Sequence, residues 1–583
     1  MRFHHLLASC VLVATSFSAG AQMLARPGWK GNGLSEQPWW KNAVIYEIYP
    51  RSFQDSDGDG VGDIKGITSR LDYLQSLGVD AIWLTPIFPS PQKDFGYDIA
   101  DFTSIDPQFG TMEDFDELVS QASRRNIRVI MDLVLNHTSD KHPWFVESAS
   151  SKDNPKRNWY VWRDGKDGST TVPPNNWLNR IQQSAWQFDP KTKQFYYHYF
   201  AVEQPDLNWR NPDVEKAMFD VARFWLNRGV AGFRLDAVNT MFEDAQFRDA
   251  PPLPGTNEYG EPARSQEYQR NQPEVHDVMK ALRKVTDSAN GQRVLIGEVY
   301  TGSTAEMATW FGAKHDEIQL PMDTSLGFLN KRNAAAFRKK MTEAQQLKLD
   351  TPLFVFDNHD RPRSWDRYGD GEHNAEIAKV IATILLASRS SALIYQGQEI
   401  GMKTTPPTRK EDVRDPRGLA GWPKEKGRDG ERTPMQWNPG ENAGFTTGKP
   451  WLPIPADYTQ HNVELEQKAK GSVLNWFHDL IALRRANPSL HEGEQVMLDQ
   501  DAQNALVWVR RSAKATKEKP PVVVACNFSA QPVTLQLKKQ VTALGIRGSF
   551  MRSLLRTDGG MGGMNLDEVK LPPFGVFIGE VRY

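Results

Sequence analysis

The stretch GFRLDAV at residues 232–238 sets the pattern from which the fold can be predicted. It is short and nearly continuous in apolar residues, as expected of a parallel strand that is buried on both faces. Seven other segments have the same character: VIYEIYP (44–50), AIWLTP (81–86), RVIMDLV (128–134), VLIGEV (294–299), EIQLPM (317–322), LFVFDN (353–358) and ALIYQGQE (392–399).

Helical patterns separate these strands. A helix is expected between the first two, with four apolar side chains on one face: Ile67, Leu71, Leu74 and Leu77. Gly78 stands where its C-terminal cap belongs. Another helix is expected over 212–228, closed by Gly229. Eight strands alternating with helices predict an α/β fold, a (β/α)8 TIM barrel, although a doubly wound open sheet would give a similar alternation.

The uneven spacing of the strands predicts further domains. The segment between the third and fourth strands is longer than one helix requires, so residues 137–209 are expected to form a small inserted domain. The barrel then takes up residues 39–136 and 210–493. Short strand-like runs such as ALVWVRR and PVVVACNF follow, which predicts a C-terminal antiparallel β-sandwich over 494–583.

The N-terminus has the layout of a secretory signal peptide over residues 1–21. Basic residues beginning at Arg2 precede an apolar run at 6–17, and a small-residue cleavage site precedes Gln22. The alternative is a buried N-terminal helix, since the run is too short to span a membrane. Residues 22–38 are rich in Gly, Pro and polar residues and are expected to be a linker. We therefore expect export by a cleavable signal, to a periplasm or outside the cell.

Composition bounds the partners. The chain has 70 Lys+Arg against 72 Asp+Glu, which gives no electrostatic reason to expect nucleic acid or an anionic membrane as a partner. Cys10 falls in the expected signal peptide, so the mature chain keeps only Cys526 and no internal disulfide. No later stretch is long and apolar enough to cross a bilayer. We expect no organic cofactor, and a monomer or a weak homo-oligomer.

Ionisable residues gather where four of the strands end: DLVLNH (132–137), GFRLD (232–236), GE (297–298) and FDNHD (356–360). Active sites of such barrels lie at the C-terminal ends of the strands. Arg234 and Asp236 are two apart, so both point into the barrel, and the guanidinium is expected to keep the carboxylate ionised. One Asp or Glu alone is more often a solvated loop residue, but their coincidence at strand ends favours a site.

These segments resemble those of a known family. DLVLNH, GFRLDAVN, GEVY and FVFDNHD are similar, in order and position, to the four signature segments of the α-amylase superfamily, glycoside hydrolase family 13. QPDLNW (204–209) and RTPMQW (432–437) resemble its oligo-1,6-glucosidase and α-glucosidase branch. The similarity extends from about Val44 into the C-terminal domain.

The resemblance implies a division of labour among three carboxylates. Asp236 would be the nucleophile and Glu298 the general acid and base, while Asp360 would hold the ring and stabilise the transition state. Two displacements would then retain the α configuration.

It also implies a set of substrate-binding residues. His137, Arg234 and His359 would hydrogen-bond the innermost sugar, with Asp132 orienting Arg234. Asp94 and Tyr97 would anchor the non-reducing end, Phe200 would form an aromatic wall, and Arg432 would close the pocket beside Asp94.

The resemblance further implies an exo-acting enzyme on a small oligosaccharide. Ala237 follows the nucleophile, where a Val goes with α-1,6 preference and a small residue with α-1,4 substrates. We therefore expect a maltase-like α-glucosidase.

Three alternatives remain. The first is an oligo-1,6-glucosidase. The second is a transglucosylase or isomerase of the sucrose isomerase or trehalose synthase type, although no arginine-rich isomerase loop follows FDNHD. The third is a non-catalytic relative like the amino-acid-transporter heavy chains.

The loop DSDGDGVGD (55–63) predicts a cation site. Carboxylates of Asp55, Asp57, Asp59 and Asp63, with the carbonyl of Val61, would suit Ca²⁺. The loop departs from an EF-hand because Gly66 stands at the twelfth position. In the resembling branch the equivalent loop is a structural Ca²⁺ site; the alternative is a metal-free acidic turn.

Overall fold

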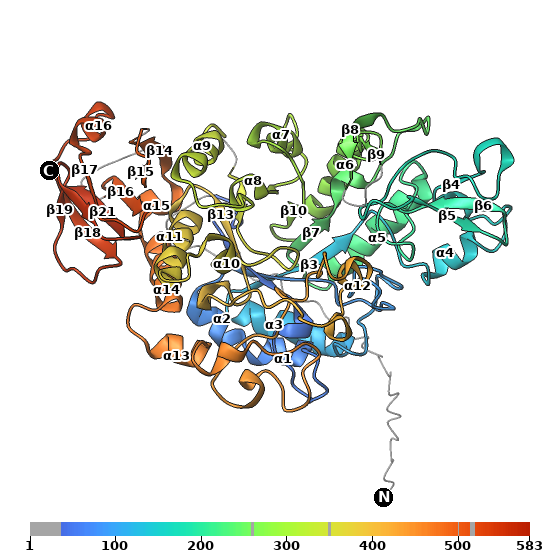
Figure 1. Ribbon diagram of the computed structural model, residues 1–583, viewed down its shortest axis with the longest axis horizontal. Helices are drawn as coiled ribbons and strands as arrows, with labels where there is room; N and C mark the ends of the chain where they lie inside the picture. Colours follow the sequence, from blue (N-terminus) through green and yellow to red (C-terminus); the bar gives the residue numbers. More distant parts are fainter. Residues whose placement is uncertain (1–36, 258–261, 348–350, 500, 513–518, 583) are drawn as a thin grey trace, which may run out of the picture. The chain divides into compact units, whose positions relative to one another are not determined.

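The eight expected strands are present and form a closed parallel barrel in the order β1-β13-β12-β11-β10-β7-β3-β2. Figure 1 labels four of them, β3, β7, β10 and β13, in the middle of the molecule. The computed structural model describes residues 37–257, 262–347, 351–499, 501–512 and 519–582. Closure of the barrel excludes the open doubly wound sheet. The strands are β1 (Val44–Ile48), β2 (Ala81–Leu84), β3 (Arg128–Val134), β7 (Gly232–Asp236), β10 (Val294–Gly297), β11 (Leu320–Asp323), β12 (Leu353–Val355) and β13 (Ser391–Tyr395).

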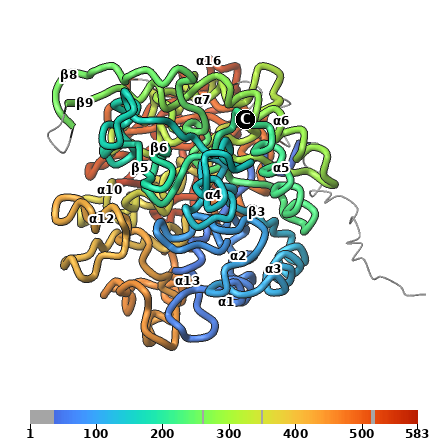
Figure 2. The backbone as a smooth tube through the Cα atoms, turned by 90° about the vertical axis from the view of Figure 1, so that its right-hand side faces the viewer, coloured from blue at the N-terminus to red at the C-terminus, as the bar shows by residue number. Residues whose placement is uncertain are grey.

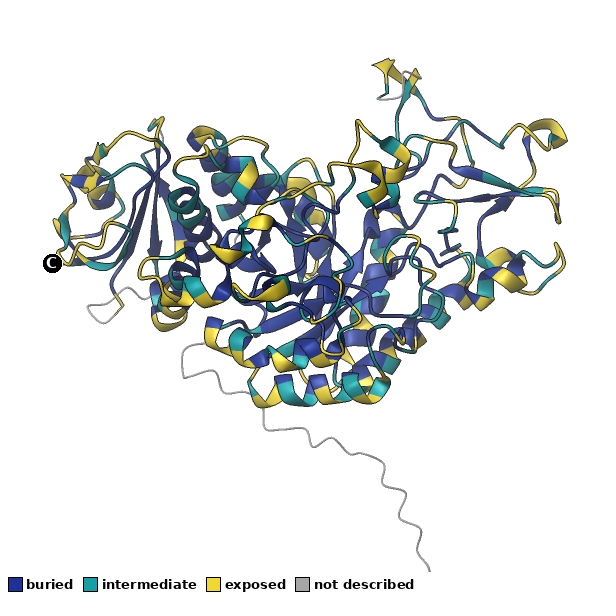
Figure 3. Cartoon of the chain, turned by 60° about the horizontal axis from the view of Figure 1, so that its bottom comes forward, coloured by how far each residue is buried: buried dark blue, intermediate teal, exposed yellow. Residues whose placement is uncertain are grey.

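The barrel strands are buried on both faces, as their apolar sequences predict. Apart from Arg128, every residue in them is buried, and Figure 3 shows them as a dark core. Inward-facing apolar side chains from several strands pack together inside the barrel, among them Ile45, Trp83, Ile130 and Val294.

The register around β7 positions the site. Arg234 of β7 pairs with Asp132 of β3 on one side and with Ile296 of β10 on the other. Asp236 lies two residues after Arg234, and Glu298 lies two residues after Ile296. Both carboxylates therefore stand at the same end of the barrel, where two neighbouring strands end.

The helix expected over 67–77 is two helices, α1 and α2, because Arg70 leaves helical geometry between them. There its guanidinium donates to Gln54 and stacks on Trp437. Gly78 caps α2 with a left-handed φ of 91°, as predicted. The helices of the barrel region are α1 (Ile64–Ser69), α2 (Leu71–Leu77), α3 (Met112–Arg124), α5 (Pro212–Asn227), α6 (Val275–Asp287), α7 (Thr304–Ala308), α8 (Thr324–Gly327), α9 (Ala334–Gln345), α10 (Ser364–Tyr368), α11 (Asn374–Ala387), α12 (Pro416–Gly421), α13 (Val463–Lys468), α14 (Val473–Ala486) and α15 (Pro488–Glu492).

The insertion after β3 has its own sheet and core. Helix α4 (Pro143–Ser148) precedes an antiparallel sheet of β4 (Trp162–Arg163), β6 (Gln194–Tyr197) and β5 (Trp186–Asp189), which face the viewer in Figure 2. Aromatic side chains fill its interior, including Trp177, Trp186 and Tyr197.

A hairpin that the sequence did not predict follows β7. It pairs β8 (Pro252–Thr256) with β9 (Pro262–Arg264) and projects outward in Figure 2, and β8 is exposed throughout.

The C-terminal region is antiparallel, as expected. One sheet has the order β14-β15-β16-β21-β18-β19, and a second pairs β17 with β20. Side chains of both sheets share one apolar core, for example Phe577 with Leu571. The elements are β14 (Glu494–Leu498), β15 (Ala505–Arg511), β16 (Val522–Asn527), β17 (Val533–Leu535), α16 (Lys538–Ala543), β18 (Phe550–Arg556), β19 (Met564–Asn565), β20 (Val569–Leu571) and β21 (Val576–Arg582).

Some sequence predictions lie beyond these observations. The expected signal peptide (1–21) and nearly all of the expected linker (22–38) fall outside the described residues and stay predictions, as do the domain boundaries. Among the described helices, none has the length and apolar character needed to cross a membrane.

Candidate active site

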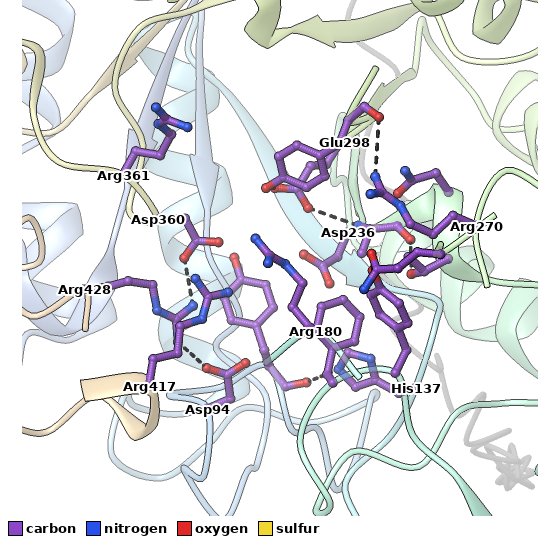
Figure 4. A pocket seen from close by; sticks show the side chains of 18 of the residues that line it. Asp94, His137, Arg180, Asp236, Arg270, Glu298, Asp360, Arg361, Arg417 and Arg428 are labelled. Atoms are coloured by element: carbon purple, nitrogen blue, oxygen red, sulfur yellow. Dashed lines mark hydrogen bonds and ion pairs between the residues drawn. The ribbon is translucent and has the colours of Figure 1, made fainter. Parts of the chain in front are cut away.

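The C-terminal ends of the barrel strands surround a cavity of about 360 Å³ (Figure 4). Asp236, Glu298 and Asp360 all line it. They come from the ends of β7, β10 and β12, which lie far apart in sequence. The structure therefore brings the predicted trio together in one site.

Arg234 is the centre of this site. Its guanidinium, which is fully buried, donates to Asp132 at 3.1 Å and to Asp236 at 2.6 Å, and forms an ion pair with Glu298 at 2.6 Å. The ring of Trp83 lies 4.8 Å from it. Asp236 and Glu298 are thus held next to one another, and Asp132 orients Arg234 as the sequence predicted.

Glu298 has two further partners. The Tyr300 hydroxyl donates to one carboxylate oxygen at 2.6 Å, and the backbone N–H of Ala237 donates to the other at 3.1 Å. Tyr300 was not among the predicted residues. It lies two positions after Glu298 in GEVY, a spacing that could have indicated it.

One guanidinium does not fully offset the effect of burial on the pKa of Asp236 and of Asp132. Burial raises the pKa of Asp236 well above its ordinary value, Arg234 opposes that rise, and the charges of Glu298 and Asp132 add to it. Burial also raises the pKa of Asp132 to about 6 against the pull of Arg234. Arg234 lies 2.6 Å from Asp236 and favours its ionised form, as expected, but it offsets the rise in the pKa of Asp236 only in part, because three carboxylates share this one cation.

Asp360 experiences the opposite balance. One of its oxygens accepts from Arg428 at 2.9 Å and from Arg432 at 2.8 Å, and His359 lies 3.5 Å away. Burial alone would raise its pKa, but His359 and the two guanidiniums hold it well below the ordinary range. Asp360 is consequently ionised at neutral pH.

Arg428, and not Arg432, is the arginine beside Asp94. It donates to Asp94 at 2.7 Å and also to Asp415 at 2.8 Å, so Asp94 and Asp360 are linked through one side chain. Arg432 instead donates to Asp360 and to the backbone carbonyl of His359. The sequence prediction that Arg432 lies beside Asp94 was therefore wrong: RTPMQW begins at Arg432, but the arginine that reaches Asp94 is Arg428, four residues before it.

The predicted substrate-binding residues fall into two groups according to their depth below the cavity surface. Some line the cavity: Asp94, Tyr97, His137, Phe200 and Ala237. Others lie behind its wall and act through their neighbours: Arg234, His359 and Arg432.

Two histidines are held in fixed positions. His137 contacts the carbonyl of Tyr97 and the amide of Gln204, each at 3.0 Å, and burial lowers its pKa to about 4, so it is neutral at pH 7. His359 stacks against Tyr97 at 5.4 Å and contacts the buried carboxyl of Glu47 at 2.6 Å. Gln204 is a further residue of the site, and it also donates to Asp94.

The acidic loop brings together part of the predicted ligand set. One carboxylate oxygen from each of Asp55, Asp57 and Asp63 lies within 4.8 Å of the other two. Asp59 is not in this group; it accepts the backbone N–H of Val61 at 2.7 Å. Backbone N–H groups of the loop also donate to Asp55 and fix its carboxylate. The three grouped carboxylates fit a hard cation.

Comparison with known proteins places the chain in a family. The α-amylase catalytic domain matches residues 47–493. The chain is 40% identical over 566 residues to a probable α-glucosidase of Rhizobium meliloti, covering 94% of this chain and 98% of that protein. It is 38% identical over 541 residues to the oligo-1,6-glucosidase of Parageobacillus thermoglucosidasius, covering 87% and 93%. The crystal structure of the α-glucosyl transfer enzyme XgtA superposes with a TM-score of 0.84 at 37% identity, covering 94% and 100%.

This protein belongs to the α-amylase family of glycoside hydrolases. The comparisons set aside the non-catalytic transporter alternative, since the similar proteins carry the names of glucosidases and a glucosyl transfer enzyme.

The shared guanidinium predicts a pH dependence. Turnover that requires ionised Asp236 should fall as pH drops through its raised pKa, above the range of an ordinary Asp near 4. Asp132→Asn removes a neighbouring negative charge, which lowers the pKa of Asp236, so the acidic limb of kcat/KM should move down by about one pH unit. The exposed Asp153→Asn is the matched control and should leave the limb in place. A limb that moves up, or stays fixed in Asp132→Asn, would contradict this account.

Proposed function

We propose that this protein is an exo-acting, retaining α-glucosidase that releases terminal glucose from short α-glucosides. Two observations carry the proposal. Asp236 and Glu298 both form ion pairs with the guanidinium of Arg234, and Arg428 links Asp94 to Asp360 in the same cavity. A closely spaced carboxylate pair suits two displacements with retention. Because Arg428 bridges the cavity between Asp94 and Asp360, the site suits the end of a sugar chain better than its interior.

The first displacement forms a glucosyl ester. Asp236 attacks the anomeric carbon as the glycosidic bond breaks, and Glu298 gives its proton to the departing oxygen. The ionised carboxylate of Asp360 offsets the positive charge that develops on the ring, since its two arginines keep it deprotonated. Tyr300 and the Ala237 N–H aim the carboxyl of Glu298.

The second displacement reverses these roles. Glu298 takes a proton from water, the resulting hydroxide attacks the anomeric carbon, and Asp236 leaves. If a sugar hydroxyl replaces water, the same steps transfer glucose instead. The similarity to a glucosyl transfer enzyme keeps that second outcome as an alternative.

Asp236→Asn is the test of the proposal. It should lower kcat/KM on maltose by at least about a thousandfold, because the nucleophile is lost while the hydrogen bonding of the site remains. NMR of the wild-type reaction should show α-glucose as the first product, with an unchanged melting temperature in the variant. β-Glucose first, internal cleavage of starch, or full activity of Asp236→Asn would refute the proposal.

We further propose that the enzyme prefers α-1,4 over α-1,6 linkages. This proposal rests on the small side chain of Ala237, which lines the cavity wall. Ala237 has a φ of 43°, a left-handed conformation that is unfavourable for a β-branched residue. Wild type should favour maltose over isomaltose. Ala237→Val should lower the ratio of the two kcat/KM values by about tenfold.

The exposed Ala469→Val serves as the control for Ala237→Val and should leave that ratio unchanged. A wild-type preference for isomaltose would instead support the oligo-1,6-glucosidase alternative.

We also propose that Asp55, Asp57 and Asp63 bind a structural Ca²⁺. Free Ca²⁺ at a hundred times Kd should then stabilise the fold by about 2.7 kcal/mol, seen as a rise in melting temperature relative to chelator. Asp57→Ala should remove most of that rise without disturbing the loop, because Asp57 is exposed and, among the described residues, its side chain accepts a hydrogen bond only from the Asp59 N–H. Asp153→Ala is the control. Equal melting temperatures in Ca²⁺ and chelator would exclude the site.

A further inference from the structure

The cavity contains four arginines that the proposed mechanism does not use. Arg180, Arg270, Arg361 and Arg417 line it together with the catalytic carboxylates. In Figure 4, Arg180 points inward between Asp236 and Asp360, and Arg417 lies beside Arg428. A glucose ring is neutral, so the proposed reaction does not require this much positive charge.

These arginines lie nearer to solvent than the acids. Asp236 and Glu298 are 8% and 4% exposed, whereas Arg180 is exposed and the other three are half-buried. In an exo-acting enzyme the terminal glucose occupies the deep part of the pocket, and the leaving group faces the opening. Under the proposed exo-acting function, these arginines therefore line the part of the cavity where the leaving group would lie.

None of the four has a carboxylate partner among the described residues. The side chains of Arg180 and Arg417 have no hydrogen bond or ion pair there. Arg270 reaches only the carbonyl of Tyr300, at 3.5 Å. Arg361 lies over the ring of Phe328 at 4.2 Å and donates to uncharged oxygens.

The carboxylates of the cavity are already engaged. Asp94 and Asp360 pair with Arg428, and Asp236 and Glu298 pair with Arg234. Arg417 consequently lies in an excess of positive charge: the neighbouring Arg428 lowers its pKa, burial lowers it further, and Asp360 and Asp94 only partly oppose this.

We propose that the subsite for the leaving group binds an anion, so that the preferred substrates are α-glucosides whose leaving group carries a carboxylate or a phosphate. Guanidinium groups present paired N–H donors that match both anions. This inference rests on the proposed glucosidase function. The reaction is unchanged: the glycosidic bond breaks, Glu298 protonates the leaving oxygen, and water completes the hydrolysis.

Two pairs of substrates test it. Maltobionate and maltitol differ only in a carboxylate against a CH₂OH group, and maltose 1-phosphate and methyl α-maltoside differ in a phosphate against a methyl group. At low salt, at least one anionic member should have a kcat/KM about tenfold above its neutral partner, as expected of one charge-assisted contact. That ratio should fall with added salt. The pair with the larger ratio identifies the anion.

Variants locate the effect. Arg417→Gln and Arg180→Gln should each reduce the anionic-to-neutral ratio severalfold while turnover of the neutral partner persists. Arg124→Gln removes the same charge from an exposed position on α3 and should leave the ratio unchanged. Ratios near one for both pairs, or an equal loss in the control, would overturn the anion subsite but not the glucosidase. Absence of turnover on all four substrates and on maltose would overturn both.

Discussion

The contact of one buried guanidinium, Arg234, with three carboxylates is the constraint on which the site depends. Burying Asp132, Asp236 and Glu298 near one another would be strongly unfavourable without a cation among them. Since Arg234 lies on β7 between β3 and β10, the parallel register of the barrel places it within reach of all three. The backbone pairing of β7 with β3 and β10 thus determines which carboxylates Arg234 can reach.

The number of arginines around each acid separates their proton affinities. Asp236 shares its guanidinium with two other carboxylates, and its pKa rises with burial. Asp360 accepts from two guanidiniums, which overcome the same burial, and its pKa falls. Both groups must be ionised in the proposed mechanism. Asp360 is held ionised by two guanidiniums, whereas Asp236 depends on a single guanidinium that it shares.

Much of the fold and part of the site could be predicted from local sequence. Buried strands have apolar runs, and polar residues at their ends indicated Asp236, Glu298 and Asp360. Other features depend on contacts between distant segments. The break at Arg70 goes with its stacking on Trp437, far along the chain. Likewise, no local signal distinguished Arg428 from Arg432, because their difference lies in which of them reaches Asp94.

Residues deep in the cavity and residues near its opening would contact different parts of the proposed substrate. Under the proposed function the inner residues would hold a neutral ring, and groups such as His137 and Tyr97 are fixed by neighbours rather than free to adapt. They would therefore treat any terminal α-glucose alike. Discrimination has to arise further out, where the leaving group contacts different side chains. A site built from polar groups that need partners rejects a ligand lacking them more strongly than an apolar wall does. The outer arginines are such groups, so under the proposed function the charge of the leaving group is the property by which the cavity entrance would select its substrate.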